Sequence, residues 1–461
     1  MSVTPTNTVR PPLVLTALLI AVASFQLNAT MLAPAITSIS TELNTTPTVV
    51  GLSSTVFLFM AAIAGIVLPP LSDIIGRRRA LVYSISVMAA GSLIATIAVN
   101  VPMLMIGRAL QGACGATISL SILMLRDLLN KRQFGKYLGI LTAVNSGVGG
   151  VDTLLGGIIA DTLGFRGIFA LTLVLELLAI VLIRLWTPES DAVVGSRMDW
   201  PGTITLALAL LAINGGLTLA FGEAGWTHGY TWACLGAGAI LLITFGLIEN
   251  RVKQPLLPMK VLRQRGVWGL LATTFFTMSS SFAVLLFLIP AWSQDVNVGF
   301  GMNGTVSALL FLLPFSLLGW AVAPFAGHFA PRVGYRLVLR IGLAGSAALI
   351  LGLIAGIEHQ WVAFVLVFLM GATYSAASAT ALNGLGIIYA PASKPGILPG
   401  LNSTMFNFGA SIGIGMLAAT IAATPDTAGF KQALIVAGVL AVIALSVSFA
   451  LPAKQVEGER V

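Results

Sequence analysis

Charged residues are scarce in this chain of 461 residues, of which Asp, Glu, Lys and Arg together make up 9%. Soluble domains carry roughly 25% charged residues, so this sequence lacks the polar surface that a water-soluble fold needs. Cysteine is almost absent as well, and the two that occur, Cys114 and Cys234, lie within apolar segments. A disulfide framework is therefore not expected.

The usual signatures of enzymes and metal sites are also missing. The three histidines fall on different predicted loops, and the sequence contains neither a His-Glu-x-x-His pattern nor a phosphate-binding loop. The string Gly409–Gly413 satisfies Gly-x-Ser-x-Gly, but it lies within an apolar helix and not at a strand-to-helix turn. We therefore expect no enzymatic activity, no metal ion and no cofactor.

Long hydrophobic runs, in contrast, fill most of the chain. A helix that crosses a bilayer needs about 20 mainly apolar residues. The segments that meet this requirement are 13–38, 47–70, 80–99, 103–125, 137–160, 167–186, 201–221, 230–249, 267–290, 304–326, 337–356, 361–380, 398–422 and 431–451. The predicted fold is an all-α membrane protein with 14 spans.

The basic residues support this number of spans. When the N-terminus is placed in the cytoplasm, 21 of the 24 Lys and Arg residues fall in inner loops and tails, Arg166 and Lys431 fall outside, and Arg108 lies within a span. A missed or invented span would scramble this asymmetry. We therefore expect both termini in the cytoplasm and the protein in the cell (inner) membrane. The basic residues form no aromatic-interleaved face, so nucleic acid is not an expected partner.

The chain divides into two blocks of six spans with two spans between them. The predicted domains are residues 1–187, 188–265 and 266–461. A short loop with a Gly and trailing Arg residues, Leu71–Arg79, follows the second span, and a similar loop, Gly327–Arg336, follows the second span of the later block. Internal repeats of this kind build transporters that work by alternating access.

The first of these loops resembles the signature loop of the major facilitator superfamily. Asp73, Gly76, Arg77 and Arg78 match its Asp-x-x-Gly-Arg-Arg core, although prolines stand at 69 and 70 where a Gly is usual. The resemblance implies a major facilitator fold, with these four residues as a conformational latch on the cytoplasmic face. The alternative is an ordinary basic inner loop.

The fourth span carries a second resemblance to this superfamily. Arg108, Gln111, Gly112 and Gly115 share one helical face and match its Arg-x-x-Gln-Gly motif. The resemblance implies that Arg108 takes part in proton handling, because an arginine in a membrane is costly and normally faces protein or water. The alternative is a structural arginine bonded to backbone carbonyls.

The fifth span lies where exporters of the superfamily carry a Gly-Pro-x-x-Gly-Gly motif. Gly156 and Gly157 match, but Asp152 and Thr153 replace Gly-Pro. We predict that Asp152 binds the transported proton, with Arg108 as the nearby charge; a permanent Asp152–Arg108 ion pair is the alternative. Glu176, in the sixth span, is a further embedded carboxylate and the third candidate for proton coupling. The resemblance places the sixth span at the periphery, which implies a protonated Glu176 packed against a neighbouring helix.

Within the first span, the segment Phe25–Pro34 resembles the family's Asp-x-Thr pattern, with Asn28 at the acidic position and Thr30 at the threonine. An amide there can bind a substrate but cannot carry a proton or attract a cation. We expect the first, fourth, ninth and twelfth spans to form a central cavity. The candidate cavity residues are Gln26, Asn28, Gln111, Asn145, Trp292, Phe315, Tyr374, Asn383, Asn402 and Asn407.

Further segments, among them Met198–Gly202 and Glu249–Pro258, resemble the fourteen-span drug:proton antiporter family. That resemblance implies export of amphipathic small molecules in exchange for protons. The alternative is proton-coupled symport for uptake of a small metabolite, which the missing Gly-Pro before Gly156 favours. The expected partners are a small-molecule substrate, protons and the lipid bilayer, and the expected state is a monomer.

Overall fold

The computed structural model describes residues 10–129, 133–134, 137–138, 140–141, 151–189, 198–252, 259–390 and 397–452. These residues are helical or in short connections, and none of them lies in a strand. Thirteen of the described helices are long and apolar enough to cross a membrane. The prediction of an all-α membrane protein is confirmed. The remaining predicted span, 137–160, is described only in part, so the count of fourteen stays a prediction.

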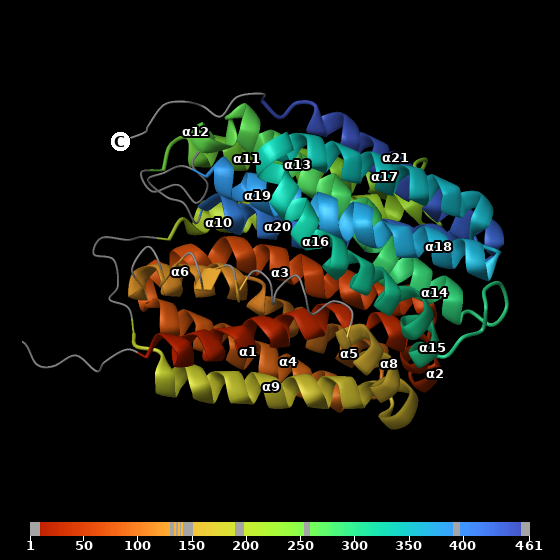
Figure 1. Cartoon of the computed structure of the whole chain (residues 1–461), viewed down its shortest axis with the longest axis horizontal. Helices are drawn as coiled ribbons and strands as arrows, with labels where there is room; N and C mark the ends of the chain where they lie inside the picture. Colours follow the sequence, from red (N-terminus) through yellow and green to blue (C-terminus); the bar gives the residue numbers. More distant parts are fainter. Residues whose placement is uncertain are drawn as a thin grey trace, which may run out of the picture.

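The N-terminal helices form one layer of the molecule, drawn from red to yellow in Figure 1. They are α1 (Pro11–Thr30), η1 (Ala33–Ala35), α2 (Ile36–Glu42), α3 (Pro47–Ile75), α4 (Arg77–Thr96), α5 (Val101–Gln111), η2 (Gly112–Cys114), α6 (Thr117–Leu128), α8 (Val151–Leu163) and α9 (Phe165–Trp186). We call them the N-block. The short 3-10 turns η1 and η2 interrupt the first and fourth spans.

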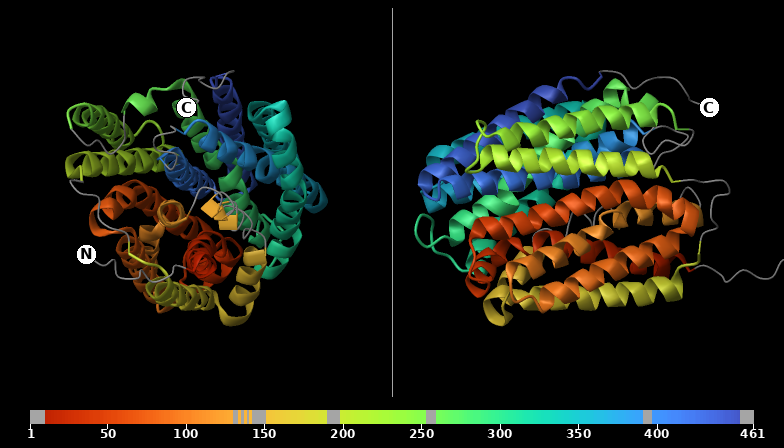
Figure 2. Two further views of the ribbon diagram at one scale, coloured as in Figure 1. Left: turned by 60° about the vertical axis from the view of Figure 1, so that its left-hand side comes forward. Right: turned by 180° about the vertical axis from the view of Figure 1, so that it is seen from behind.

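Three helices follow before the second block: α10 (Trp200–Phe221), α11 (Gly229–Glu249) and α12 (Met259–Leu262). The second block, which we call the C-block, consists of α13 (Arg265–Thr277), η3 (Met278–Phe282), η4 (Val284–Leu288), α14 (Ile289–Gln294), α15 (Gly304–Ser307), η5 (Ala308–Leu312), α16 (Leu313–Val333), α17 (Tyr335–Gly356), α18 (Gln360–Met370), η6 (Gly371–Ser378), α19 (Ala379–Ile388), α20 (Ile397–Ala423) and α21 (Thr427–Ser448). Figure 2 shows α10 and α11 side by side on the flank of the bundle.

The two short loops that resemble each other in sequence also share a backbone conformation. Gly76 joins α3 to α4 with φ 94° and ψ 143°, and Gly334 joins α16 to α17 with φ 96° and ψ 127°. Residues with a side chain rarely adopt this region of backbone space, so a glycine is required at both turns. The internal repeat between the blocks is therefore visible at the level of single dihedral angles.

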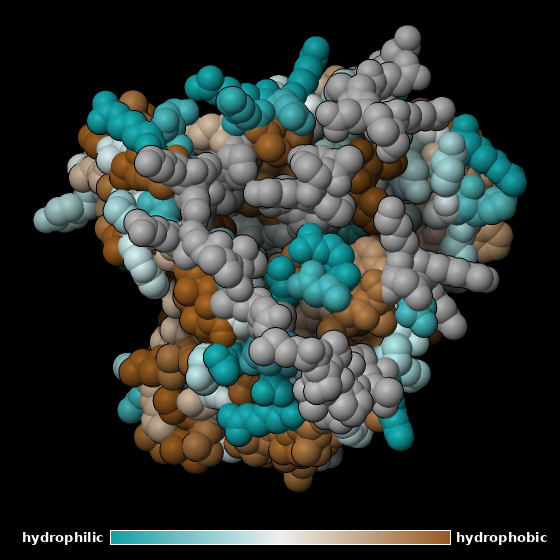
Figure 3. Space-filling model, turned by 90° about the vertical axis from the view of Figure 1, so that its left-hand side faces the viewer, coloured by the Kyte–Doolittle hydropathy of each residue, from teal (hydrophilic) through white to brown (hydrophobic). Residues whose placement is uncertain are grey.

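The helices run along one axis, so the molecule has two ends (Figure 1). We call the end where α1 begins and α21 finishes the termini end, and the opposite one the far end. Figure 3 looks onto the termini end, where hydrophilic side chains gather between brown, hydrophobic flanks. The side chains of Ile240, Phe325 and Leu185 are examples of large apolar groups that the flanks expose. Such surfaces are stable in lipid.

The two basic residues predicted to lie outside the membrane are both paired with an acid. Arg166 pairs with Glu42, and Lys431 Nζ lies 2.6 Å from Glu358 Oε1. The hydrogen bond and the charge of Lys431 lower the pKa of Glu358. Both cations therefore have a neutralising neighbour at the far end of the bundle.

Candidate functional site

A cavity of about 320 Å³ lies between the two blocks. Its described walls include parts of α1 and α6 of the N-block and of α13, η3, η4, α16, η6, α19 and α20 of the C-block. Arg126, near the end of α6, is one of the lining residues, so the cavity extends toward the termini end. Arg126 is also the one charged side chain among the described lining residues.

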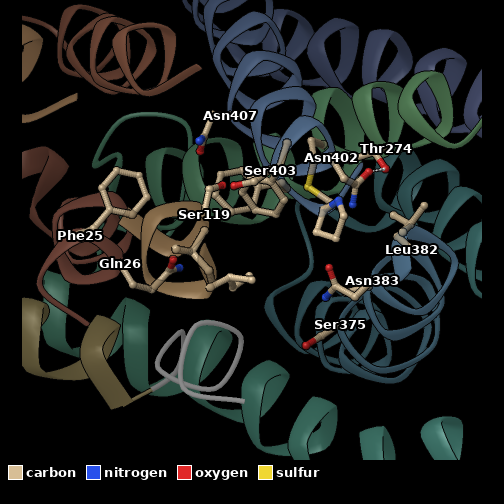
Figure 4. Close-up of a pocket in the computed structure, with 18 of the residues that line it drawn as sticks. Phe25, Gln26, Ser119, Thr274, Ser375, Leu382, Asn383, Asn402, Ser403 and Asn407 are labelled. Atoms are coloured by element: carbon tan, nitrogen blue, oxygen red, sulfur yellow. Dashed lines mark hydrogen bonds between the residues drawn. The ribbon is translucent and has the colours of Figure 1, made fainter. Parts of the chain in front are cut away.

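The cavity wall combines aromatic rings with neutral polar groups. The rings include Phe25, Phe282, Phe315, Trp320, Tyr374 and Phe406, and the amides are Gln26, Asn383, Asn402 and Asn407. Figure 4 shows Gln26 and Ser119 on the N-block side, with Asn383 and Ser375 across from them. Two of the C-block segments, η3 and η6, are π-helical, and such widened turns occur frequently at functional sites.

The amide side chains differ in what they offer a ligand. Thr274 Oγ1 lies 2.6 Å from Asn402 Oδ1, so this amide is already held by a neighbouring helix. Within the described part of the chain, the side-chain amides of Gln26, Asn383 and Asn407 have no hydrogen-bond partner. These three amides are therefore available to donate and accept hydrogen bonds from a bound solute.

The structure places six of the predicted cavity residues in this wall and three outside it. Those in the wall are Gln26, Phe315, Tyr374, Asn383, Asn402 and Asn407. Asn28 and Gln111 are instead buried in a polar network of the N-block, and Trp292 packs against Phe300 and Phe430 near the far end. Asn145 lies outside the described residues.

Arg108 is the centre of that network. Its side chain is fully buried, and Nη1 donates to Asn28 O (3.0 Å) and to Gln111 Oε1 (2.8 Å). The guanidinium also lies 4.1 Å from the centre of the Phe57 ring. Among the described residues, Arg108 forms no ion pair with Asp152 or Glu176. The alternative of a permanent Asp152–Arg108 pair therefore does not describe this conformation.

Glu176 joins the same network from α9. Its Oε1 accepts hydrogen bonds from Asn28 Nδ2 (2.7 Å) and Ser92 Oγ (2.8 Å), and Ser92 in turn accepts from Gln111 Nε2 (2.9 Å). The carboxylate is fully buried. From α9 the Glu176 side chain points inward against α1 and α4, where it shares Asn28 with Arg108 and reaches Gln111 through Ser92.

Asp152 occupies a separate position in the N-block. Its side chain is buried near the N-terminal end of the described α8, and the hydroxyl of Thr30 donates to its Oδ2. Its Oδ1 accepts from the backbone N–H of Thr153 at 2.8 Å. Thr30 also lines the cavity, so a single hydroxyl group separates this carboxylate from the cavity.

The far end of the bundle is closed by contacts between the blocks. A Cβ atom placed on Gly304 of α15 would lie 2.2 Å from Pro34 O, and one on Gly157 of α8 would lie 2.8 Å from Gly304 O. Gln294 of α14 accepts from Thr37 Oγ1 at 2.9 Å and donates to Ala33 O at 3.2 Å. The described residues thus close the cavity at the far end.

The predicted latch residues lie at the termini end. Arg77 forms ion pairs with Asp73 (3.2 Å) and with Asp127 of α6, and Arg78 lies 3.5 Å from Glu189. Each of these ion pairs joins residues of the N-block or the segment directly after it. In this conformation, these pairs fasten α3, α4, α6 and the end of α9 to one another.

Two contributors to the site were not singled out from the sequence. Ser92 bridges Gln111 and Glu176, and Asp161 at the end of α8 binds the backbone of α15. Ser92 is an ordinary small polar residue in an apolar span. Asp161 is an acidic residue near the outer end of a span, which is only a weak signal in the sequence for a contact between the blocks. Its partners, Gly304 and Thr305, are 143 and 144 residues away.

The sequence matches known families along most of its length. The profile of the Major Facilitator Superfamily matches residues 18–414. A uridine/deoxyuridine transporter of Lactococcus lactis subsp. cremoris (strain MG1363) is 37% identical over 450 residues, which cover 95% of this chain and 93% of that protein. The multidrug resistance protein Stp of Mycobacterium tuberculosis (strain CDC 1551 / Oshkosh) is 29% identical over 361 residues, which cover 77% of this chain and 65% of that protein.

Solved structures share the fold at low sequence identity. A D-xylose-proton symporter superposes with a TM-score of 0.70 and 14% identity, covering 98% of this chain and 100% of that chain. A peptide transporter, POT, in complex with sulfate superposes with a TM-score of 0.67 and 16% identity, covering 95% and 94%. These identities show a common fold alone.

Proposed function

Because this chain belongs to the Major Facilitator Superfamily, we propose that it carries a neutral, nucleoside-like solute into the cell together with protons. The chain is a multi-pass membrane transporter and not an enzyme. The proposal concerns its substrate, its direction and its driving ion. The proposal also places both termini in the cytoplasm, has the cavity face the cytoplasm, and takes the protein to act as a monomer in the cell membrane.

The chemistry of the cavity wall is the observation that carries this proposal. Aromatic rings stack on planar bases, and amide groups pair with the carbonyl and N–H groups of a base edge or with ribose hydroxyls. Gln26, Asn383 and Asn407 supply such amides, and no described lining residue is a carboxylate that would attract a cation. The similarity to a uridine/deoxyuridine transporter supports the same substrate class.

Two buried carboxylates support protons as the driving ion. Asp152 and Glu176 lie within the N-block without an ion pair among the described residues. A carboxylate in a membrane is costly and is most often retained for a proton pathway. In the proposed cycle, Asp152 binds the proton, the latch around Arg77 re-pairs, and the two blocks rock about the cavity to expose it alternately to each side.

Export of amphipathic compounds by proton antiport is the second candidate. The similarity to a multidrug resistance protein and the apolar rings of the cavity favour it. The two candidates differ in the sign of coupling: a symporter accumulates its substrate on the side to which protons flow, and an antiporter on the opposite side.

Transport in proteoliposomes tests the proposal. With the outside acidic, labelled uridine is expected to accumulate inside and to be displaced by deoxyuridine but not by an amphipathic cation. Gln26→Leu and Asn407→Leu are expected to raise the KM for uridine by about tenfold, the effect of one lost hydrogen bond. Asn297→Leu, an exposed loop amide, is the matched control. If uridine were not transported and the amphipathic cation moved against the proton gradient, the export candidate would be established instead.

A further inference from the structure

The last residue of α1, Thr30, belongs both to the cavity wall and to the surroundings of Asp152. It is buried, its side chain lines the cavity, and its hydroxyl contacts Asp152 Oδ2. The same Oγ1 atom lies 2.8 Å from the backbone carbonyl oxygen of Gln26. One hydroxyl thus faces two oxygen atoms, each of which accepts hydrogen bonds.

A threonine hydroxyl has a single proton to donate. When Asp152 is ionised it can only accept, so Thr30 donates to the carboxylate. When Asp152 is protonated, its own O–H can donate to Thr30 Oγ1, and the threonine proton then turns to the Gln26 carbonyl. The protonation state of Asp152 therefore sets the direction of the Thr30 hydroxyl on a helical turn that forms part of the cavity wall.

Other titratable groups on the elements packed against α8 have partners elsewhere or lie near the termini end. One element packed against α8 is α9, which carries three titratable residues. Glu176 is bonded to Asn28 and Ser92, and Arg166 is paired with Glu42. The third, Arg184, lies near the termini end. The described residues of α1, η1, α15 and η5 include no titratable side chain, and those of α16, His328 and Arg332, lie near the termini end. Asp161, on α8 itself, binds the backbone of α15. Thr30 is the one side-chain partner of Asp152 among the described residues.

We infer that Thr30 couples substrate binding to protonation of Asp152 by switching its one hydroxyl proton between the Asp152 carboxylate and the Gln26 carbonyl. This inference rests on the proposed proton-coupled transport. The affinity of a solute that binds against Thr30 and Gln26 therefore depends on whether the Thr30 hydroxyl proton points to Asp152 or to the Gln26 carbonyl. By linkage, the proton then changes substrate affinity by the same factor by which the substrate changes proton affinity. Thr30 is in this sense a positioning residue that acts through Asp152.

Two substitutions at position 30 separate the hydroxyl from the shape of the side chain. Thr30→Val keeps the shape and removes the hydroxyl, whereas Thr30→Ser keeps the hydroxyl. Thr16→Val is the matched control, since Thr16 lies on the same helix and its hydroxyl also bonds a carbonyl four residues earlier, that of Pro12, on the exposed side of α1. The probe is labelled uridine in proteoliposomes, measured as counterflow without a gradient and as the steady-state accumulation ratio under a pH gradient.

We expect Thr30→Val to slow counterflow without abolishing it, to lower the accumulation ratio to unity, and to remove the pH dependence of KM. Thr30→Ser restores both, and Thr16→Val behaves as the wild type. The inference would be overturned if Thr30→Val accumulated uridine and kept the pH dependence of KM as the wild type does. It would also be overturned if Thr30→Val lost both counterflow and accumulation, because that result indicates a role of Thr30 in binding or folding alone. Failure of the wild type to accumulate uridine refutes the proposed function and is seen before any variant is compared.

Discussion

Asp161 of α8 accepts a hydrogen bond of 2.8 Å from the backbone N–H of Thr305, the second residue of α15. A side chain of the N-block thus adds to the N-cap residue Asn303 at the start of a helix in the C-block, and the N–H of Gly304 gives Asp161 a second bond at 3.2 Å. A carboxylate at this position also interacts favourably with the helix dipole. This contact joins the two blocks across the closed far end, so it stabilises the conformation in which the far end is closed.

Removal of this contact is expected to shift the conformational equilibrium. Loss of these hydrogen bonds costs about 1 kcal/mol, so Asp161→Ala should raise the population open at the far end by roughly fivefold. Distance distributions between spin labels at Thr162 and Val296, in a background without Cys114 and Cys234, measure this population. Asp426→Ala is the control, because Asp426 caps α21 within its own block. An unchanged distribution in Asp161→Ala would show that the contact does not bias the equilibrium.

Gly304→Ala is expected to prevent closure of the far end. The added Cβ would lie 2.2 Å from the carbonyl oxygen of Pro34, a backbone atom that cannot move aside cheaply. The same spin labels should report a far end that stays open, and uptake should fall to background. Gly236→Ala, on exposed α11 with open space around its Cα, should leave both measurements unchanged. A closed far end in Gly304→Ala would contradict the packing described above.

The repeated glycine turns make a prediction about stability alone. Gly334 has φ 96°, and a Cβ atom added to it would meet open space, so Gly334→Ala adds backbone strain without a clash. Strain of this kind costs on the order of 1–3 kcal/mol. The Tm of the purified protein in detergent should therefore drop by a few degrees, with Gly236→Ala as reference. A Tm equal to that of the wild type would mean that the turn relaxes freely.

Features within one segment were predictable from the sequence, whereas contacts between distant segments were not. Hydrophobic runs and the distribution of basic residues predicted the spans, and the spacing of Arg108 and Gln111 placed them on one face, where they share a hydrogen bond of 2.8 Å. The bond between Asn28 and Glu176 joins residues 148 positions apart, and no helical periodicity specifies it. Family resemblance placed the sixth span at the periphery, but the order of the helices does not specify which side chains Glu176 contacts.

The same reasoning explains where the predicted cavity wall was inaccurate. Polar residues within spans were assigned to the cavity, but a buried amide is satisfied equally well by another polar side chain. Asn28 and Gln111 bind Glu176 and Arg108 in this way. The π-helical turns η3 and η6, which form part of the cavity wall, leave hydropathy unchanged and so gave no signal in the sequence.

The two buried carboxylates are expected to respond differently to neutral substitution. Glu176→Gln retains an oxygen that accepts from Asn28 and Ser92, so uridine accumulation under a pH gradient should persist. Glu176→Leu would remove the acceptor of the Ser92 hydroxyl and of one Asn28 N–H, whose other bond goes to Ser24 O, at a cost of about 1–3 kcal/mol each, and should reduce the amount of folded protein. Loss of accumulation in Glu176→Gln at normal expression would identify Glu176 as the proton carrier in place of Asp152.

Proton movement driven by the substrate tests the central claim most directly. Uridine is added outside proteoliposomes that hold a pH-sensitive dye and have no initial pH gradient, and the internal pH is followed for the wild type and Asp152→Asn. The account predicts acidification of the interior on addition of uridine to the wild type and none with Asp152→Asn, while uridine counterflow by the variant continues. Alkalinisation of the interior, or acidification that persists in Asp152→Asn, would contradict it.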